Sequence, residues 1–150
     1  MLQQTIDQDI KAAMLAKDAV RLRGLRAIKA ALLNAKTEKG ASETLAEDAE
    51  VKVLQRLVKQ RKESADIYST QNRPDLQQIE LEELEIIEAY LPKQMDRDAI
   101  KTHVQDAIAR SGATSAKDMG KVMGLVNKEL AGKADGKSIS EVVKELLASL

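Results

Sequence analysis

The chain has 150 residues, enough for one domain of ordinary size or two small ones, and its 43% hydrophobic and 32% charged residues are typical of a folded, well-solvated protein. It contains no cysteine, which excludes a disulfide, a thiolate metal site and a cysteine nucleophile. The formal net charge of zero argues against a general nucleic-acid coat protein. The charge is nevertheless sorted: Lys17–Lys39 holds seven basic and two acidic residues, and Pro74–Leu91 holds six acidic and none basic. Sorted charge favours surfaces with partners.

The N-terminal segment contains no apolar stretch. Residues 1–17 carry Asp7, Asp9, Lys11 and Lys17, so the segment is neither a secretory signal peptide nor a membrane span. Because nothing here predicts export or anchoring, we expect a cytoplasmic protein that does not bind a membrane.

Helical periodicity begins at once, and no segment shows the alternating pattern of a strand. The first predicted helix has apolar residues every four positions from Leu2 to Met14, and Asp18 is placed to be the N-cap of the second. The second helix is expected to bury an apolar stripe running from Leu22 to Leu33. Small residues cover another side of the same helix, which predicts packing on two faces: Ala27, Ala30, Ala31 and Ala35.

Two more helices are predicted before residue 92. The second helix is expected to end within residues 39–42, where Gly40 is a candidate C′ residue. The third is predicted from about Leu45 to Tyr68. The fourth is predicted to start at Pro74, a favourable first helical residue, and to reach Leu91.

The best domain boundary is Leu91-Pro92-Lys93-Gln94, because proline lacks the backbone donor and disfavours helix at the residue before it. Three shorter helices are predicted beyond it: Asp96–Arg110, Ser115–Ala131, and a last helix that begins at a capping box of Ser138 and Glu141. The chain is therefore predicted to be all-α. We expect an N-terminal domain of about four helices, residues 1–92, and a three-helix tail domain, residues 95–150.

The helix expected at Ser115–Ala131 carries the most informative pattern. At about 100° per residue, Lys117, Lys121 and Lys128 fall together opposite the apolar arc, with Gly124 beside them. Glycine in mid-helix costs about 1 kcal/mol relative to alanine, and close approach of another backbone would explain Gly120 and Gly124. Two more lysines follow around a glycine-containing turn that we expect to be flexible. The candidate RNA-backbone contacts are Lys117, Lys121, Gly124, Lys128, Lys133 and Lys137.

A structural explanation of the same pattern stays open: the glycines would let neighbouring helices pack closely, with the lysines simply solvated.

The mode of RNA recognition is constrained by the near absence of aromatic residues. Tyr68 and Tyr90 are the only ones, and both are expected in the core. Without aromatic platforms for unpaired bases, recognition of folded, double-helical RNA by shape and phosphate is favoured.

Two segments resemble the signature of the GatB/YqeY tail domain: Met119-Gly120-Lys121-Val122-Met123-Gly124 and Gly132-Lys133-Ala134-Asp135-Gly136-Lys137. Upstream, residues 21–34, Lys59-Gln60-Arg61-Lys62 and residues 88–94 resemble the N-terminal part of stand-alone YqeY proteins. The resemblance covers essentially the whole chain in order.

The same tail ends the B subunit of the glutamine-dependent amidotransferase that converts misacylated Glu-tRNA or Asp-tRNA to the amide form. The resemblance therefore implies contact with tRNA through the five lysines of the candidate set, and it supplies no catalytic residue. Family members carry additional basic residues between Val126 and Gly132, where this chain has Glu129 and Ala131. That departure implies a weaker contact there.

No catalytic, cofactor or metal site is predicted. Hydrolysis of glutamine requires an activated nucleophile, Cys with His or a Ser-Ser-Lys arrangement, and the single histidine, His103, is expected at the flank of a helix. Residues 120–124 lie within a predicted helix and lack the form of a phosphate cradle. The acids from Glu80 to Glu88 spread around a helix and are interpreted as a solvated face.

A second set of basic residues has two interpretations. The set consists of Arg23, Arg26, Lys59, Arg61 and Lys62. These residues could form ion pairs with the acidic helix, which is the more economical interpretation, or they could extend the basic surface.

Three functions are carried forward. The first is a tRNA- or RNA-binding accessory protein. The second is a helical protein–protein adaptor, which includes a protein partner in a tRNA-linked complex. The third, by family label only, is an amidotransferase-associated activity, a carbon–nitrogen ligase with glutamine as amido donor.

Overall fold

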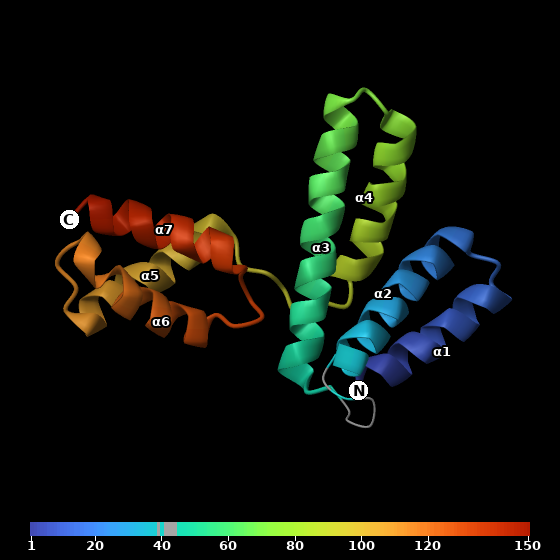
Figure 1. Ribbon diagram of the computed structural model, residues 1–150, viewed down its shortest axis with the longest axis horizontal. Helices are drawn as coiled ribbons and strands as arrows, with labels where there is room; N and C mark the ends of the chain where they lie inside the picture. The colour runs from blue at the N-terminus through green and yellow to red at the C-terminus, as the bar shows by residue number, and fades with distance from the viewer. Residues whose placement is uncertain (39, 41–44) are drawn as a thin grey trace. The chain divides into compact units, whose positions relative to one another are not determined.

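The computed structural model describes residues 1–38, 40 and 45–150 and is all-α, as predicted (Figure 1). Its contacts divide the chain into two compact units, Met1–Leu91 (unit 1) and Pro92–Leu150 (unit 2). None of the described helices is long and apolar enough to cross a membrane.

Unit 1 consists of two helical hairpins. Helices α1 (Leu2–Leu15) and α2 (Ala19–Glu38) pack together, and α3 (Glu47–Thr70) packs along α4 (Pro74–Glu88) (Figure 1). Helix α2 also contacts both α3 and α4 and so joins the hairpins. The core between them is built from fully buried aliphatic side chains: Ile6, Leu25, Ile28, Leu32, Leu54 and Ile87.

The helix ends of unit 1 follow local chemistry. The Asp18 carboxylate accepts a hydrogen bond from the Arg21 backbone N–H at 3.0 Å, which is the predicted capping contact of α2. Pro74 is the first residue of α4, as predicted. Gly40 has a φ of 103°, the left-handed conformation expected of a C′ residue; the neighbouring predicted positions 39, 41 and 42 lie outside the described residues.

One glycine lets α2 and α4 approach each other closely. Gly24 is buried on α2, and a Cβ atom built there would lie 2.9 Å from Cγ2 of Ile86 and 3.0 Å from its Cβ. Real Cβ atoms do not pack at that distance, so only glycine fits without a shift of one helix.

Unit 2 packs three helices around its own core. Helix α5 (Arg97–Ser111) is followed by a 3₁₀ turn at Ala116–Asp118, α6 (Met119–Glu129) and α7 (Gly136–Ala148), and all three α-helices contact one another. Asp96 caps α5 by accepting from the Ala99 N–H at 2.8 Å, and Gly112 ends it in the left-handed conformation. The core consists mainly of Ile100, Val104, Val122, Val126, Leu130, Ile139 and Val143.

Several predicted details are wrong. Helix α4 ends at Glu88, not Leu91, because the last residues before Pro92 turn out of the helix. Leu33, which was expected to be buried, is 41% exposed. Tyr68 and Tyr90, both expected in the core, are half-buried, and Tyr90 packs against the buried core of unit 1. The Tyr90 hydroxyl donates to Asp9, and burial together with this hydrogen bond raises the pKa of Tyr90 to about 12.

Candidate nucleic-acid interface

The predicted single helix at Ser115–Ala131 is two elements. Ser115 begins a 3₁₀ turn through a reciprocal capping box with Asp118, and α6 proper starts at Met119. The backbone N–H groups of Thr114 and Ser115 donate to the Asp118 carboxylate, and they hold its pKa below its usual value. The helical wheel used above therefore applies only to α6, and Lys117 lies on the preceding turn.

Within α6 the predicted two faces are present. Val122 and Val126 are fully buried, whereas Lys121, Gly124 and Lys128 are exposed. The two lysines are seven residues apart, close to two helical turns, so they project from the same side of α6. Lys117 is also exposed on its 3₁₀ turn.

The connection between α6 and α7 departs from the predicted flexible turn. The Lys133 carbonyl accepts from the Met95 N–H at 2.8 Å, and the Gln94 side-chain amide donates to the Gly132 carbonyl at 2.9 Å. Gly132 has a φ of 79° and so adopts the left-handed conformation. These bonds fix the backbone that presents the exposed Lys133 side chain.

Lys137 lies in the first turn of α7, not on a turn before the helix. The predicted capping box of Ser138 and Glu141 is wrong: Asp135 is the N-cap, and its carboxylate accepts from the Ser138 N–H at 2.6 Å. The helix therefore begins at Gly136, three residues earlier than a cap at Ser138 would place it. Lys137 is exposed there.

The structure separates the two explanations of the α6 glycines. A Cβ built on Gly120 or on Gly124 meets no atom within 4 Å. No neighbouring helix among the described residues comes close enough to require glycine at either position. The intramolecular packing explanation therefore does not account for them, and both leave bare backbone beside Lys121 and Lys128.

Unit 2 uses its acidic residues internally. Arg97 pairs with Glu141 and Glu145, and Arg110 pairs with Asp106 and Glu129. Three further carboxylates cap helical turns: Asp96, Asp118 and Asp135. Asp98 alone among the acids of unit 2 has neither role.

The lysines of unit 2 are left without ion pairs. Both arginines of the unit are paired, but none of its eight lysines forms an ion pair with a described residue. Glu129, the acid that departs from the family pattern, is held by Arg110 at 2.8 Å, and this hydrogen-bonded partner keeps the pKa of Glu129 below its usual value. Its negative charge is thus balanced by Arg110, not by a lysine of the candidate surface.

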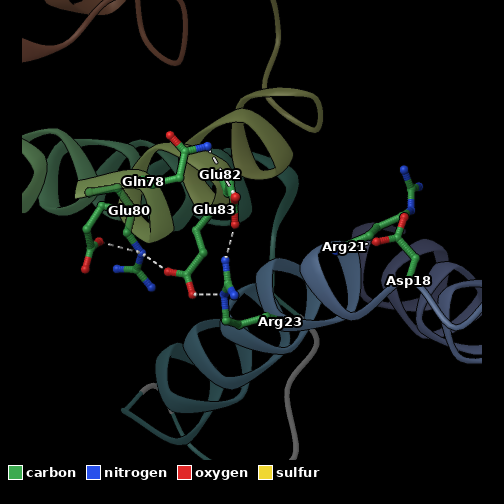
Figure 2. Close-up of polar contacts among 8 residues, drawn as sticks. Asp18, Arg21, Arg23, Gln78, Glu80, Glu82 and Glu83 are labelled. Atoms are coloured by element: carbon green, nitrogen blue, oxygen red, sulfur yellow. Dashed lines mark hydrogen bonds and ion pairs between the residues drawn. The ribbon is translucent and has the colours of Figure 1, made fainter. Parts of the chain in front are cut away.

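In unit 1 the basic residues have mixed roles. Glu83 of α4 accepts from Arg23 of α2 at 3.1 Å and from Arg61 of α3 at 2.8 Å, and Glu82 accepts from Arg23 at 2.8 Å (Figure 2). A carboxylate oxygen of Glu80 (Oε2) lies 3.7 Å from Nε of Arg61. The pairing interpretation is correct for these arginines.

The solvated face predicted for the acids of α4 is only partly present: Glu85 and Glu88 are exposed, but Glu80, Glu82 and Glu83 are half-buried in ion pairs. The Glu83 side chain is only 12% exposed, because guanidinium groups from two other helices surround it. Lys62 lies 3.8 Å from Glu88, a longer and more exposed pair. Arg26 and Lys59 are exposed and form no ion pair with a described residue. Charge sorting in the sequence indicated this network but not which cations would enter it.

The histidine and the acidic residues are also considered as chemical groups. His103 is exposed on α5. Among the described residues, no three His, Cys, Asp or Glu side chains are grouped so that they could hold a metal ion.

Comparison with known proteins identifies relatives along the whole chain. Residues 3–147 match the model of the family described as Yqey-like protein. The protein named "Altered inheritance of mitochondria protein 41, mitochondrial" from Clavispora lusitaniae is 31% identical over 154 aligned residues, covering 99% of this chain and 86% of that protein. The protein of the same name from Meyerozyma guilliermondii is 39% identical over 87 residues, covering 58% of this chain and less than half, 44%, of that protein.

These relatives overturn the predicted cytoplasmic location, because both are named as mitochondrial proteins. The prediction relied on the missing apolar stretch in residues 1–17. Apolar stretches are the mark of secretory signals, whereas mitochondrial targeting uses amphipathic, arginine- and serine-rich segments that an apolar search does not detect. With one full-length relative above 30% identity and a family model that spans residues 3–147, the chain belongs to the Yqey-like protein family.

Proposed function

We propose that this protein binds the phosphate backbone of structured RNA, with tRNA as the leading candidate, through the lysine surface of unit 2. The lysine surface consists of Lys117, Lys121, Lys128, Lys133 and Lys137, with the bare backbone at Gly124. The mitochondrial names of the relatives make mitochondrial RNA the proposed cellular source.

The observation that carries the proposal is that in unit 2 the arginines form ion pairs, whereas the lysines form none with a described residue. The two arginines satisfy four carboxylates, and helix caps occupy three more. The lysine ammonium groups are therefore exposed and available to an external anion. A polyanion that releases counterions on binding is the ligand such a surface suits best.

The lysine surface supports contact with phosphate more than contact with bases. Unit 2 contains no aromatic residue, so it has no platform for stacking unpaired bases. Lysine is a point charge without the planar fork that reads guanine edges. Double-helical RNA, recognised by shape and phosphate spacing, fits these side chains.

The relation to tRNA amidation is part of the proposal. The tail resemblance suggests an accessory role beside an amidotransferase or another tRNA-processing enzyme. We propose that the chain alone catalyses no amide transfer. Glutamine hydrolysis needs a nucleophilic side chain activated by a general base, and the lysine surface, as defined by its residues, includes no nucleophilic side chain of that kind.

The first test is the salt dependence of tRNA binding. If about four phosphates are engaged, affinity should fall roughly a hundredfold between about 50 and 200 mM salt. Filter binding of labelled bulk tRNA to the full chain measures this. Binding with no dependence on salt would reject the phosphate contact.

The second test places the contact on α6. Lys121→Glu/Lys128→Glu should weaken tRNA binding at least tenfold more than Lys101→Glu/Lys144→Glu, which makes the same charge change on α5 and α7. All four lysines are exposed, so the melting temperatures should match that of the unmodified protein. Equal losses from both pairs would show a general charge effect and remove the site.

A further inference from the structure

A groove between α2 and α3 is not used by the proposed RNA contact. Its volume is about 410 Å³, within the range of roughly 300–1,000 Å³ typical of ligand pockets. Alanine side chains of α2 and the apolar Val53 and Leu57 of α3 form much of its wall, so the predicted second packing face of α2 is only partly covered. The lining residues are Ala27, Ala30, Ala31, Asn34, Ala35, Glu38, Val53, Arg56, Leu57, Gln60 and Arg61.

Helix α3 carries exposed cations at and beside the groove: Arg56 belongs to the lining, whereas Lys52 and Lys59 do not. Lys52, Arg56 and Lys59 follow one another at spacings of four and three residues, so they lie on one face of α3. All three are exposed, and none forms an ion pair with a described residue. Arg61, deeper on the same helix, is instead neutralised by Glu80 and Glu83.

The α2 side combines one more cation with exposed apolar surface. Arg26 and Leu33 are seven residues apart, about two turns, and so lie on the same side of α2. Arg26 is exposed and forms no ion pair with a described residue, and Leu33 is 41% exposed. Ala30, which lines the groove, lies on the turn between them. The groove thus combines an apolar strip of alanines, Val53 and Leu57 with polar lining residues, among them Glu38 at one end and Arg56 in the α3 wall. Arg26, Lys52 and Lys59 lie on the same two helices outside this lining.

We propose that this groove docks an amphipathic helix of a partner protein, with apolar side chains inserted between α2 and α3 and acidic residues facing Arg26, Lys52, Arg56 and Lys59. Helices bind grooves through apolar residues at spacings of three and four, and the alanines allow a close approach. This inference does not depend on the RNA contact of unit 2.

Charge and polarity favour that occupant over the alternatives. RNA phosphates would gain nothing from the alanines, Val53 and Leu57, and the groove lining includes no aromatic side chain for a base. A second copy of this chain is a poor partner because its acidic helix α4 already pairs with Arg23 and Arg61.

The experiment uses a defined probe, a fluorescent designed peptide with leucines at positions i, i+3, i+4 and i+7 and glutamates elsewhere. Its counterpart has lysine at every glutamate position. Fluorescence anisotropy with the full chain should show the acidic peptide binding at least about tenfold tighter than the basic one. Equal binding of the two peptides would overturn the proposal.

Two variants test the location, each with a matched control. Ala30→Gln fills the groove with a neutral, helix-compatible side chain, and Arg56→Glu reverses one bordering charge; each should weaken acidic-peptide binding about tenfold. The controls Ala12→Gln and Lys11→Glu change exposed positions on α1 and should bind like the unmodified chain.

Three outcomes would overturn the docking site. The first is unchanged peptide binding by Ala30→Gln and Arg56→Glu. The second is loss of tRNA binding, but not peptide binding, on Arg56→Glu. The third is sedimentation showing a dimer that Ala30→Gln dissociates. Loss of tRNA binding by Lys121→Glu/Lys128→Glu with normal peptide binding would leave this proposal intact, so the two proposals fail separately.

Discussion

Units 1 and 2 both place glycine within a helix, but the two units surround it differently. In α2, Gly24 is buried against Ile86 of α4, and a Cβ would lie 2.9 Å from that side chain. In α6, Gly120 and Gly124 face open space. The first glycine is explained by the fold of its own unit. The α6 glycines are unfavourable for the isolated helix, and packing among the described residues does not require them.

The charged residues repeat this contrast. In unit 1, Arg23 and Arg61 converge on Glu83, so ionic contacts connect three helices (Figure 2). In unit 2, the arginines pair with four carboxylates and helix caps use three more, while no lysine of the unit forms an ion pair with a described residue. In unit 1 both residue types are mixed, since Lys29 pairs with Asp7 and Arg26 is exposed without an ion pair to a described residue. That difference can be tested by substitutions that affect one unit and not the other.

The largest effect is expected from Gly24→Ala, which should lower the free energy of unfolding by about 2 kcal/mol. Inserting a methyl into a packed contact costs roughly 1–3 kcal/mol, and three Ile86 atoms at 2.9–3.0 Å place this site at the upper end of that range. Alanine's better helix propensity offsets about 1 kcal/mol of that cost, which leaves a net loss of about 2 kcal/mol. Urea denaturation followed by circular dichroism measures the change.

Relief of the clash provides the control for Gly24→Ala. Ile86→Ala removes the atoms that the new Cβ would meet. In that background Gly24→Ala should become neutral or stabilising, a coupling visible in a double-mutant cycle. Additive effects of the two substitutions would show that Gly24 is not there for the approach of α4.

A smaller loss is expected from Glu83→Gln. The side chain keeps its shape but no longer neutralises Arg23 and Arg61, so we expect a loss of about 1–2 kcal/mol, between the values typical of exposed and buried pairs. Glu88→Gln is the matched control. Its 3.8 Å contact with Lys62 is about half exposed, and its removal should change stability by no more than about 0.5 kcal/mol. Similar losses from both substitutions would contradict a special role for the network.

The sequence was informative where one local rule determines the outcome. Asp18, Pro74 and Gly112 mark helix ends because capping and left-handed conformations depend on neighbouring residues. Ser138 misled because Asp135 competes for the same backbone donors and starts α7 earlier. Here two acceptable caps lie three residues apart, and periodicity cannot choose between them.

Tertiary contacts were less predictable. Gly24 looks in the sequence like any glycine in a helix, since its requirement arises from Ile86, 62 positions further along the chain. The sequence also does not distinguish the exposed cations of α3 from the neutralised one, although in the structure Arg61 pairs with Glu83 and Arg56 does not. The exposed side of α6 that carries Lys121 and Lys128 was predicted from helical spacing, because α6 has one well-defined apolar side. Its role in RNA binding stays a prediction.

The smallest effect, and the one with opposite sign, is expected from Gly124→Ala. A Cβ meets nothing within 4 Å, so the gain in helix propensity should stabilise unit 2 by up to about 1 kcal/mol; Gly120→Ala, in the first turn of α6, should gain less. If the bare backbone receives RNA, Gly124→Ala should also weaken tRNA binding while stability rises. Thermal melting and filter binding on the same protein preparation measure both quantities. A loss of stability would show an internal packing role, and higher stability with unchanged tRNA binding would remove Gly124 from the contact while leaving the lysines to be tested on their own.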